Sequence, residues 1–374
     1  MITLLCLLVF LGYLLTLVQL IWGAKQLRPF EGSNQTPTTF FSIIVPFRNE
    51  SEHLPRLLES LQNLDYPREL FELIFVDDFS SDNSVKLLYQ WRMAHGSIQT
   101  TLLETIRLSN SPKKDAISRA IPIVQQQWII TTDADCVVPS SWLKTLDCYL
   151  QNKEANMVIG AVCSQSDSSF LAEFQLLDLL SLQGATQGSF GMGLGFLCNG
   201  ANLAYTKAHF QEVHGFAGNG NLASGDDVFL VQKSMQHNSV KVHYLLSAAH
   251  LVQTKFEKSW KELLQQRTRW ASKTSSFPSV FGKDLALWVL LGNLSWILLG
   301  MLSWIQDWPL GWFAGITSLK FGVDYLLIRA AKKNMPIGRL KYVLLSSLLY
   351  PFYCVFIALH ALPGTYTWKG RTLS

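Results

Sequence analysis

Apolar residues are unevenly distributed along the chain, with long uninterrupted runs near both ends and short runs in between. Residues 2–22 contain no charge, and a helix of about 20 apolar residues is long enough to cross a bilayer. Three further apolar segments lie near the C-terminus, at about 285–305, 308–328 and 342–362. The pattern therefore predicts one N-terminal and about three C-terminal membrane spans around a soluble middle.

The first apolar segment could instead be a cleaved signal peptide. Such a peptide needs a basic N-terminal region, whereas Met1-Ile2-Thr3 supplies no charge. Lys25 and Arg28 follow the segment, and basic residues are retained on the cytoplasmic side. We therefore expect an integral protein of a bacterial inner membrane, with its soluble domain in the cytoplasm. The segment between the last two spans is also basic, with Arg329, Lys332, Lys333, Arg339 and Lys341.

Short apolar runs alternate with helical patterns through the middle of the chain. This alternation at short spacing indicates an α/β fold with a mostly parallel, doubly wound sheet. One helix is predicted from Leu54, Leu57, Leu58 and Leu61, which recur with a helical period. The predicted strands cover residues 40–47, 71–76, 128–132 and 157–162, with a less regular one at 101–108.

Acidic residues follow two of these strands. Asp77 and Asp78 follow the second strand, and Asp133 and Asp135 follow a later one. In an open α/β sheet, ligands bind at the carboxyl ends of the strands. Two carboxylates one residue apart provide the hard oxygen ligands that Mg²⁺ or Mn²⁺ takes when it binds substrate phosphates. The alternative is helix capping, because Asp135 or Ser140 could precede a helix.

The second half of the soluble middle has fewer clear patterns. A helix is predicted at 170–183, followed by a glycine-rich stretch at 184–200. This stretch lacks the G-x-G-x-x-G spacing, so we predict no dinucleotide site. A second carboxylate pair, Asp226-Asp227, precedes an apolar run, and an amphipathic helix is predicted at 260–270. We expect that helix, in a region near 255–275, to lie at the membrane interface.

Composition narrows the classes of function. Hydrophobic residues make up 49% of the chain and the mean hydropathy is +0.19, which agrees with membrane spans. The net charge is only +4 and the basic residues are scattered, so nucleic acid is not an expected partner. None of the six cysteines forms a C-x-x-C pair and the histidines lack a metal-ligand spacing, so a zinc site is not expected.

Six short motifs occur in one order along the soluble middle. They are Ile44-Val45-Pro46, Val76-Asp77-Asp78 with Ser80 and Asp82, Lys113-Lys114-x-Ala116-Ile117, Asp133-x-Asp135, Gly225-Asp226-Asp227 and Gln266-Arg267-x-Arg269-Trp270. Together they resemble the inverting family 2 glycosyltransferases with a GT-A fold, in the membrane-bound branch that includes cellulose, chitin and hyaluronan synthases. The resemblance implies a Rossmann-like GT-A domain at 38–280. An N-terminal transmembrane helix at 1–24 and C-terminal transmembrane helices at 284–364 would flank it, the latter matching only in kind.

The resemblance implies a nucleotide-sugar donor and assigns two motifs to it. Asp77 or Asp78 would accept hydrogen bonds from the base and ribose, and Lys113 and Lys114 would approach the nucleotide or its phosphates. From the residues alone, turn and cap chemistry is the alternative for the two aspartates. A solvated helix face is the alternative for the two lysines.

The other carboxylates would perform the chemistry. Asp135, supported by Asp133, would hold Mg²⁺ or Mn²⁺ on the donor diphosphate, where a cation neutralises charge on the leaving group. Asp227 would be the general base that takes the proton of the acceptor hydroxyl. The family usually has Glu-Asp where this chain has Asp226-Asp227, so the chain departs from the family pattern at Asp226 and keeps it at Asp227. A helix start before Val228 is the alternative for this pair.

The last motif comprises Gln266, Arg267, Arg269 and Trp270. The resemblance implies that the arginines of this motif bind the diphosphate of the donor and that Trp270 stacks at the acceptor end of the site. The same residues also suit an amphipathic helix at the lipid headgroups, and the two roles are compatible. By position, Asn199 to Asn202 is a candidate for lining the acceptor pocket.

These assignments predict a metal-dependent, inverting glycosyltransferase. It would move a hexosyl or N-acetylhexosaminyl group from a nucleotide sugar, with a UDP-sugar favoured, to a hydroxyl of a membrane-associated lipid or lipid-linked acceptor. Processive synthesis of a chitin-, hyaluronan- or poly-N-acetylglucosamine-like polymer is the alternative, because chain-forming synthases contain Q-R-x-R-W. A third hypothesis is a non-catalytic membrane scaffold. It is disfavoured because the chain retains both Asp135 and Asp227. The sequence leaves a homo-oligomer open, and Asp324 in a predicted span needs a partner or a polar cavity.

Overall fold

The structure is a computed structural model that describes residues 2–32, 35–164, 169–220, 222, 225–306, 309–362, 366–368 and 371–373. The chain forms two compact units. We call residues 28–165 and 197–255 the sheet unit, and residues 1–27, 166–196 and 256–374 the helical unit. The predicted transmembrane helices also include residues 1, 307–308 and 363–364, which lie outside the described residues.

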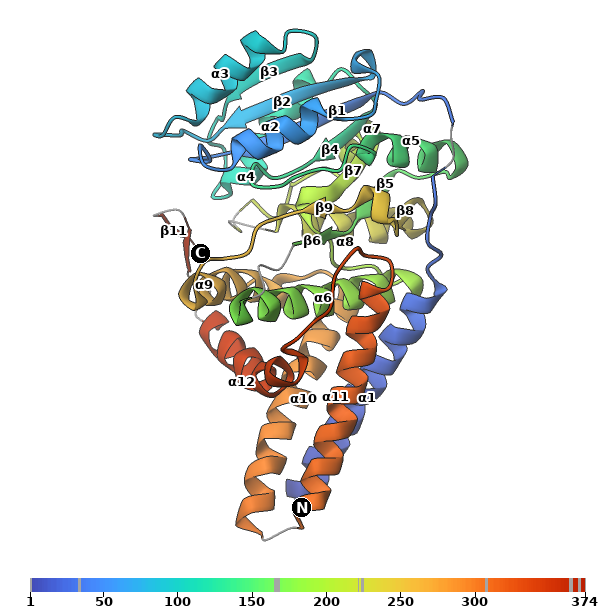
Figure 1. Cartoon of the computed structure of the whole chain (residues 1–374), viewed down its shortest axis with the longest axis vertical. Helices are drawn as coiled ribbons and strands as arrows, with labels where there is room; N and C mark the ends of the chain where they lie inside the picture. The colour runs from blue at the N-terminus through green and yellow to red at the C-terminus, as the bar shows by residue number, and fades with distance from the viewer. Residues whose placement is uncertain are drawn as a thin grey trace. The chain divides into compact units, whose positions relative to one another are not determined.

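A mixed sheet forms the centre of the sheet unit (Figure 1). Within the described residues it has seven strands in the order β3-β2-β1-β4-β7-β5-β8. The strands β3, β2, β1 and β4 are mutually parallel, β7 is antiparallel to both of its neighbours, and β5 is parallel to β8. The strands are β1 (Phe41–Phe47), β2 (Phe71–Asp77), β3 (Gln99–Glu104), β4 (Trp128–Thr131), β5 (Met157–Gly160), β7 (Leu203–Thr206) and β8 (Val242–Leu245).

Helices cover both faces of the parallel part of the sheet. Alternate residues of β1 (Phe41, Ile43 and Val45) share one buried cluster with the leucines of α2 and α5. On the other side, α4 contacts β1 and β2. Strands buried on both faces are mostly apolar along their length, which is why their sequence signal is clear. The helices are α2 (Leu54–Gln62), α3 (Ser84–Ala94), α4 (Pro112–Ala120), α5 (Trp142–Asn152), α7 (Lys207–Glu212) and α8 (Asp226–Asn238).

The predicted α/β class and mostly parallel sheet are confirmed, with differences in detail. The strand predicted at 101–108 is β3 and ends at Glu104, because the chain beyond it turns toward α4, where Asp115 accepts hydrogen bonds from the N–H groups of Leu108 and Ser109. Strands β7 and β8 were not predicted, since four-residue runs have little periodicity. A short parallel pair, β6 (Val162–Cys163) with β9 (Val252–Gln253), completes the unit.

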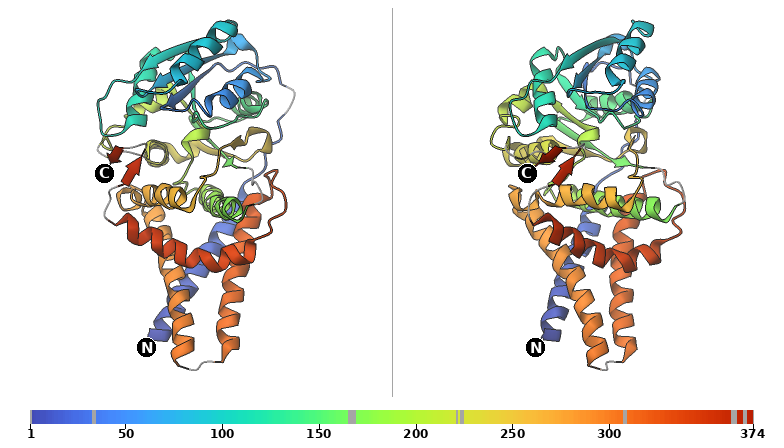
Figure 2. Two further views of the ribbon diagram at one scale, coloured as in Figure 1. Left: turned by 60° about the vertical axis from the view of Figure 1, so that its left-hand side comes forward. Right: turned by 90° about the vertical axis from the view of Figure 1, so that its left-hand side faces the viewer.

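The helical unit contains the long apolar helices. Figure 2 shows α1, α10 and α11 running alongside one another, with α12 lying across them. Within the described residues, α1, α10 and α12 are long and apolar enough to cross a membrane, which supports one N-terminal and two to three C-terminal spans. The helices are α1 (Ile2–Gln26), α6 (Phe170–Gly191), α9 (Trp260–Ala271), α10 (Val280–Ile305), α11 (Leu310–Lys332) and α12 (Val343–Ala361), and β10 (Tyr366–Trp368) pairs with β11 (Arg371–Leu373).

Helix α6 is longer than predicted and belongs to the helical unit. It runs to Gly191 rather than Gln183, because the glycines beyond Gln183 lie inside the helix and allow close packing. A Cβ atom on Gly188 would lie 2.5 Å from the carbonyl oxygen of Leu20, and one on Gly191 would lie 1.8 Å from that of Gly23. Small residues in apolar helices permit this approach of two backbones. The glycine-rich stretch is therefore largely a helix interface between α6 and α1.

Two polar contacts stand out among the packed helices. The sequence analysis identified no partner for Asp324, which lies on α11. In the structure, Asp324 accepts hydrogen bonds from the hydroxyl of Tyr13 (2.5 Å) and from Nζ of Lys320 (2.6 Å). The Lys320 side chain is fully buried.

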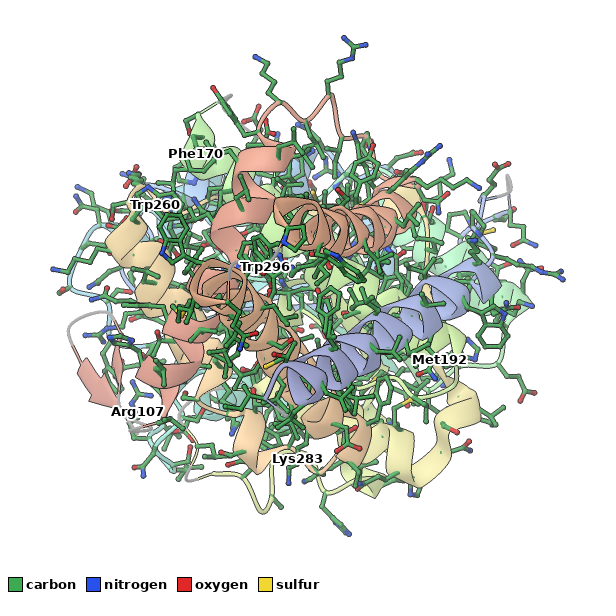
Figure 3. The ribbon with its side chains drawn as sticks, turned by 90° about the horizontal axis from the view of Figure 1, so that it is seen from below. Arg107, Phe170, Met192, Trp260, Lys283 and Trp296 are labelled. Carbon is green, nitrogen blue, oxygen red and sulfur yellow. The ribbon has the colours of Figure 1, made fainter. Side chains whose placement is uncertain are left out.

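Aromatic rings connect other helices of this unit. Phe170 on α6 and Trp260 on α9, both labelled in Figure 3, have ring centroids 5.9 Å apart.

Candidate active site

The first acidic motif lies where β4 leaves the sheet. The strand ends at Thr131, whose hydroxyl donates to the carbonyl oxygen of Gly200 at 2.7 Å. Asp133 and Asp135 follow in a short turn, with side chains that are 36% and 25% exposed. The capping alternative for Asp135 does not hold, because α5 begins at Trp142 and its N-cap residue is Ser141. The two carboxylates are therefore accessible at the carboxyl end of a central strand.

Lys113 connects this motif to the second acidic pair. It lies in the first turn of α4, and its Nζ is 2.6 Å from Oδ1 of Asp133 and 3.7 Å from Oδ2 of Asp226. Burial opposes the lysine charge, but the carboxylates of Asp133, Asp226 and Asp227 outweigh it and raise the pKa of Lys113. A permanently charged ammonium thus stands between carboxylates from two distant parts of the sequence.

Asp226 and Asp227 begin α8. The preceding Gly225 has a φ of 81°, a conformation that favours glycine, and it turns the chain into the helix. Asp226 is buried, while Asp227 accepts hydrogen bonds from the N–H groups of Gly200 (Oδ2, 2.8 Å) and Val228 (Oδ1, 2.8 Å). The helix-start alternative is thus correct as a description of local structure, and it is compatible with a catalytic role.

Gly200 allows these groups to come together. A Cβ atom at this position would lie 3.1 Å from Nζ of Lys113 and 3.2 Å from Cβ of Asp227. The structure therefore places Asp133, Asp226 and Asp227 close to Lys113. The catalytic and binding roles of these residues remain predictions.

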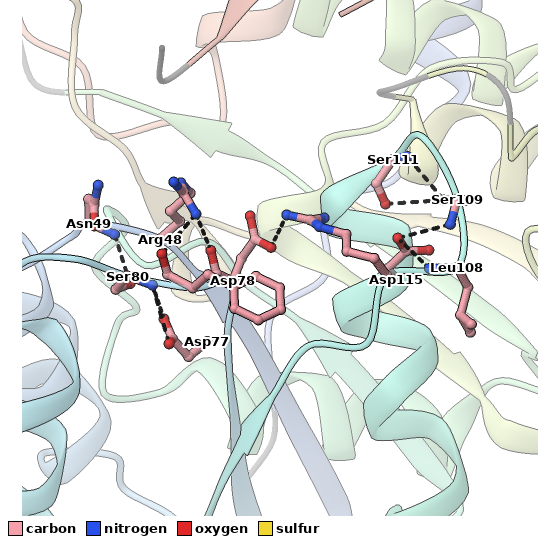
Figure 4. Close-up of polar contacts among 11 residues, drawn as sticks. Arg48, Asn49, Asp77, Asp78, Ser80, Leu108, Ser109, Ser111 and Asp115 are labelled. Atoms are coloured by element: carbon pink, nitrogen blue, oxygen red, sulfur yellow. Dashed lines mark hydrogen bonds and ion pairs between the residues drawn. The ribbon is translucent and has the colours of Figure 1, made fainter. Parts of the chain in front are cut away.

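Asp77 is the last residue of β2 and Asp78 is the first residue of the loop that follows, as Figure 4 shows. Asp77 accepts a hydrogen bond from the N–H of Ser80 at 3.0 Å, which is turn chemistry. Asp78 is buried and forms an ion pair with Arg107, while Arg48 donates to its carbonyl oxygen at 2.5 Å. Base and ribose recognition by either aspartate remains a prediction. Arg107 was not predicted, because it follows β3 in a stretch without a recognisable motif.

Lys114 and Asn202 both have structural partners. The buried Lys114 ammonium donates to the carbonyl oxygens of Asn219 (2.6 Å) and Leu222 (2.9 Å), and burial lowers the pKa of Lys114 to about 8. It holds the segment before α8 to α4, so a nucleotide contact would be an additional role. Asn202 is buried and donates to the carbonyl oxygens of Ala161 and His250. Its side chain supports the fold. Asn199 also has a local partner, because its Oδ1 accepts a hydrogen bond from the N–H of Ala201 at 3.0 Å, and a place for Asn199 in an acceptor pocket remains a prediction.

The motif Gln266, Arg267, Arg269 and Trp270 lies on α9 in the helical unit. Arg267 is buried, its Nε is 2.5 Å from Oδ2 of Asp178 on α6, and its Cζ is 4.1 Å from the ring centroid of Trp270. Gln266 accepts a hydrogen bond from Arg267. Asp178, which had no sequence motif, is therefore the partner of this arginine. Contact between the motif and the donor remains a prediction.

The carboxylates of Asp133 and Asp135, which follow β4, are chemically suited to bind a divalent cation. Burial and the neighbouring Asp133 raise the pKa of Asp135, and a bound cation would relieve that repulsion. Within the described part of the chain, no three His, Cys, Asp or Glu residues are grouped so that they could hold a metal. Two carboxylates with water and substrate phosphates completing the shell are the usual way in which Mg²⁺ is bound. Asp133 and Asp135 suit that arrangement.

A mixed α/β sheet with acidic residues at the carboxyl ends of its parallel strands, and an acidic pair opening the helix beside them, is the architecture of glycosyltransferases with a GT-A fold. Sequence comparison agrees. The model of glycosyl transferase family 2 matches residues 42–212, and that of glycosyl transferase family group 2 matches residues 128–366. The chain belongs to glycosyltransferase family 2.

Similar proteins act on different acceptors. The chain is 26% identical over 149 residues (40% of its length) to the poly-beta-1,6-N-acetyl-D-glucosamine synthase of Staphylococcus epidermidis. It is 24% identical over 153 residues (41%) to the beta-monoglucosyldiacylglycerol synthase of Trichormus variabilis. The matches span 34% and 32% of those two proteins, about a third of their lengths.

A solved structure with a similar fold covers nearly the whole chain. The mannosyltransferase PcManGT from Pyrobaculum calidifontis, in complex with GDP-Man and Mn²⁺, aligns with a TM-score of 0.63 at 16% identity. The alignment covers 97% of this chain and 99% of that one. At this identity the similarity establishes the fold.

Proposed function

We propose that this chain is a metal-dependent, inverting glycosyltransferase that transfers one sugar from a nucleotide sugar to a hydroxyl of a membrane lipid or lipid-linked acceptor. The observation that carries the proposal is the position of Lys113, which contacts Asp133 after β4 and Asp226 at the start of α8. This position joins a carboxylate pair suited to a cation to a carboxylate pair suited to proton transfer. A UDP-sugar is the donor that we favour.

In the proposed reaction, the acceptor oxygen attacks C1 of the sugar and its proton passes to Asp227. The bond between C1 and the diphosphate oxygen breaks, and the nucleoside diphosphate leaves. The two N–H groups that bind Asp227 hold its carboxylate in one orientation. Asp133 and Asp135 would hold Mg²⁺ or Mn²⁺, which supplies positive charge to the leaving diphosphate. Lys113 adds a fixed positive charge between the two carboxylate pairs.

A lipid acceptor is supported by the helical unit and by one of the relatives. Three described helices are apolar enough to cross a membrane, and the diacylglycerol-glucosylating relative matches 41% of the chain. The sheet unit would lie in the cytoplasm, where nucleotide sugars are made. This orientation is predicted by Lys25 in the last turn of α1 and Arg28 just after that helix.

Processive polysaccharide synthesis is the second candidate. It is favoured by the similarity to the poly-N-acetylglucosamine synthase, which is as high as that to the lipid glycosylating relative. The two functions differ in product length. A lipid bearing one sugar supports the first, and a high-molecular-weight polymer supports the second.

The test is incubation of membranes containing the chain with a panel of UDP- and GDP-sugars and Mn²⁺ or Mg²⁺, followed by mass spectrometry of the lipid extract. We expect one lipid species heavier by a single hexose or N-acetylhexosamine, absent from membranes that contain the Asp227→Asn variant. Labelled sugar found only in a polymer would replace the first function with the second. No transfer from any donor would refute both.

A further inference from the structure

Lys255 is a charged residue beside the proposed metal site that none of the motifs includes. Its Nζ lies 3.7 Å from Oδ2 of Asp135 and 3.2 Å from Nε2 of His53. His53, just before α2, in turn has its Nδ1 atom 2.8 Å from a carboxylate oxygen of Glu50. The lysine is thus placed between groups that follow β4 and groups that follow β1.

The backbone itself brings Lys255 to Asp135. Val137 and Gln253 form an antiparallel bridge, with N–H to carbonyl distances of 2.8 and 2.9 Å in the two directions. In an antiparallel pair, a residue two positions before one partner stands opposite the residue two positions after the other. Asp135 and Lys255 have that relationship. Their proximity therefore follows from main-chain pairing and is not a chance side-chain contact.

Each carboxylate of the motif after β4 has its own lysine. Lys113 pairs with Asp133 at 2.6 Å, and Lys255 pairs with Asp135 at 3.7 Å. A divalent cation that binds Asp135 would meet the Lys255 ammonium at close range, and the two positive charges repel. The Lys255 side chain is 38% exposed and flexible, so its ammonium can move to a new anion nearby. The diphosphate of the donor is an anion that would arrive with the cation.

We propose, on the basis of the function proposed above, that Lys255 neutralises Asp135 until the cation and the donor bind, and then binds the donor diphosphate. Lys255 is in this way a donor-binding residue that couples the two ligands. The cation by itself binds weakly because it must displace a lysine, and the nucleoside diphosphate strengthens its binding because it gives that lysine a partner.

The test uses the full chain in detergent and the Lys255→Met variant, which keeps the length of the side chain and removes its charge. Binding of Mn²⁺ alone is measured by electron paramagnetic resonance, and binding of UDP at saturating Mn²⁺ is measured by equilibrium dialysis. We expect Mn²⁺ alone to bind about tenfold more tightly to the variant, and UDP to bind about tenfold more weakly. Lys255→Arg retains the charge and should restore both affinities toward those of the unmodified chain.

Opposite changes in the two affinities distinguish this role from a structural one, which would weaken both or neither. Lys144→Met is the matched control, because Lys144 is also a partly exposed lysine paired with an aspartate, Asp65, and it should change neither affinity. If the unmodified chain binds Mn²⁺ and UDP but Lys255→Met alters neither affinity, Lys255 has no such role and the proposed function survives. If the unmodified chain binds neither ligand, the proposed function fails and this inference fails with it.

Discussion

The backbone N–H of Gly200 donates a hydrogen bond to Oδ2 of Asp227 at 2.8 Å. The N–H of Val228 is 2.8 Å from the other oxygen of the same carboxylate. Gly200 also accepts a hydrogen bond from Thr131, the last residue of β4. The geometry of the proposed general base is therefore tied directly to the strand that presents Asp133 and Asp135.

Replacing Asp227 with asparagine tests this arrangement. Asparagine has nearly the same shape but cannot take up the proton of the acceptor hydroxyl, and its NH₂ group cannot accept one of the two backbone N–H bonds. We expect the rate of sugar transfer to fall by about 10²–10⁴-fold. UDP affinity should stay within about twofold, because the proposed metal and diphosphate ligands are untouched. Transfer rates and UDP binding are measured side by side, with Asp65→Asn, an exposed aspartate paired with Lys144, as the control. Normal transfer by Asp227→Asn would remove Asp227 from the mechanism.

Removal of the divalent cation should abolish activity. Because Asp133 and Asp135 would supply only part of the coordination shell, we expect chelation by EDTA to be fast and fully reversible on adding Mn²⁺ or Mg²⁺. Asp135→Asn should lower activity by about a hundredfold or more at any Mn²⁺ concentration. Glu154→Gln, an exposed carboxylate on the surface of the sheet unit, is the control and should behave like the unmodified chain. Full activity in excess EDTA would show that no metal is required.

The ion pair between Lys320 and Asp324 should be important for the stability of the helical unit. Lys320 is fully buried, so Lys320→Met leaves Asp324 without its cation and should lower the free energy of unfolding by about 3 kcal/mol. Replacing both residues, as Lys320→Met with Asp324→Leu, should recover most of that loss because no charge is then left unpaired. Thermal unfolding in detergent measures both effects, with the exposed Lys283→Met on α10 as the control. Equal loss in the single and double variants would contradict the pairing argument.

The glycine interface between α6 and α1 makes a prediction about packing. Gly188→Ala places a methyl group 2.5 Å from the Leu20 carbonyl oxygen, so the helices must separate and the thermal midpoint should fall. Gly322→Ala on α11 is the matched control, since a Cβ atom there meets nothing within 4 Å and alanine favours the helix by roughly 1 kcal/mol. The two alanine variants should therefore shift the midpoint in opposite directions. A higher midpoint for Gly188→Ala would show that this interface is not tightly packed.

His250 should make the sheet unit sensitive to acid. Burial lowers its pKa to about 4, below the ordinary value of 6.5, so the unfolded chain binds a proton more readily than the folded one between these values. The contribution of the neutral imidazole to the free energy of unfolding is fully present above about pH 6.5. It is lost as the pH falls toward 4, and the total loss is roughly 3 kcal/mol. Urea unfolding across this range measures the slope. His250→Asn should flatten it, and the half-exposed His237→Asn should not.

The sequence by itself determined the elements whose signal is local. Buried strands such as β1 and β2 are mostly apolar, with Ser42 and Glu72 as the polar residues within them. The acidic residues that end β2 and follow β4 mark the ligand-binding edge of the sheet. The apolar helices at both ends are equally plain, because a span needs only length and hydrophobicity. These features and the ordered motifs allowed the α/β class and the family to be predicted from the chain alone, and they indicated candidate site residues whose roles remain predictions.

Only the tertiary structure decided which charges meet. Lys113 joins Asp133 to Asp226, Lys255 stands opposite Asp135, and Asp324 contacts Tyr13, because strand pairing or helix packing brings distant segments together. Lys320, the other partner of Asp324, is four residues away on the same helix and is a local contact. The extension of α6 through its glycines also depends on a neighbouring helix. Contacts of this kind depend on the register and packing of whole elements, which no local pattern of hydrophobic and polar residues encodes.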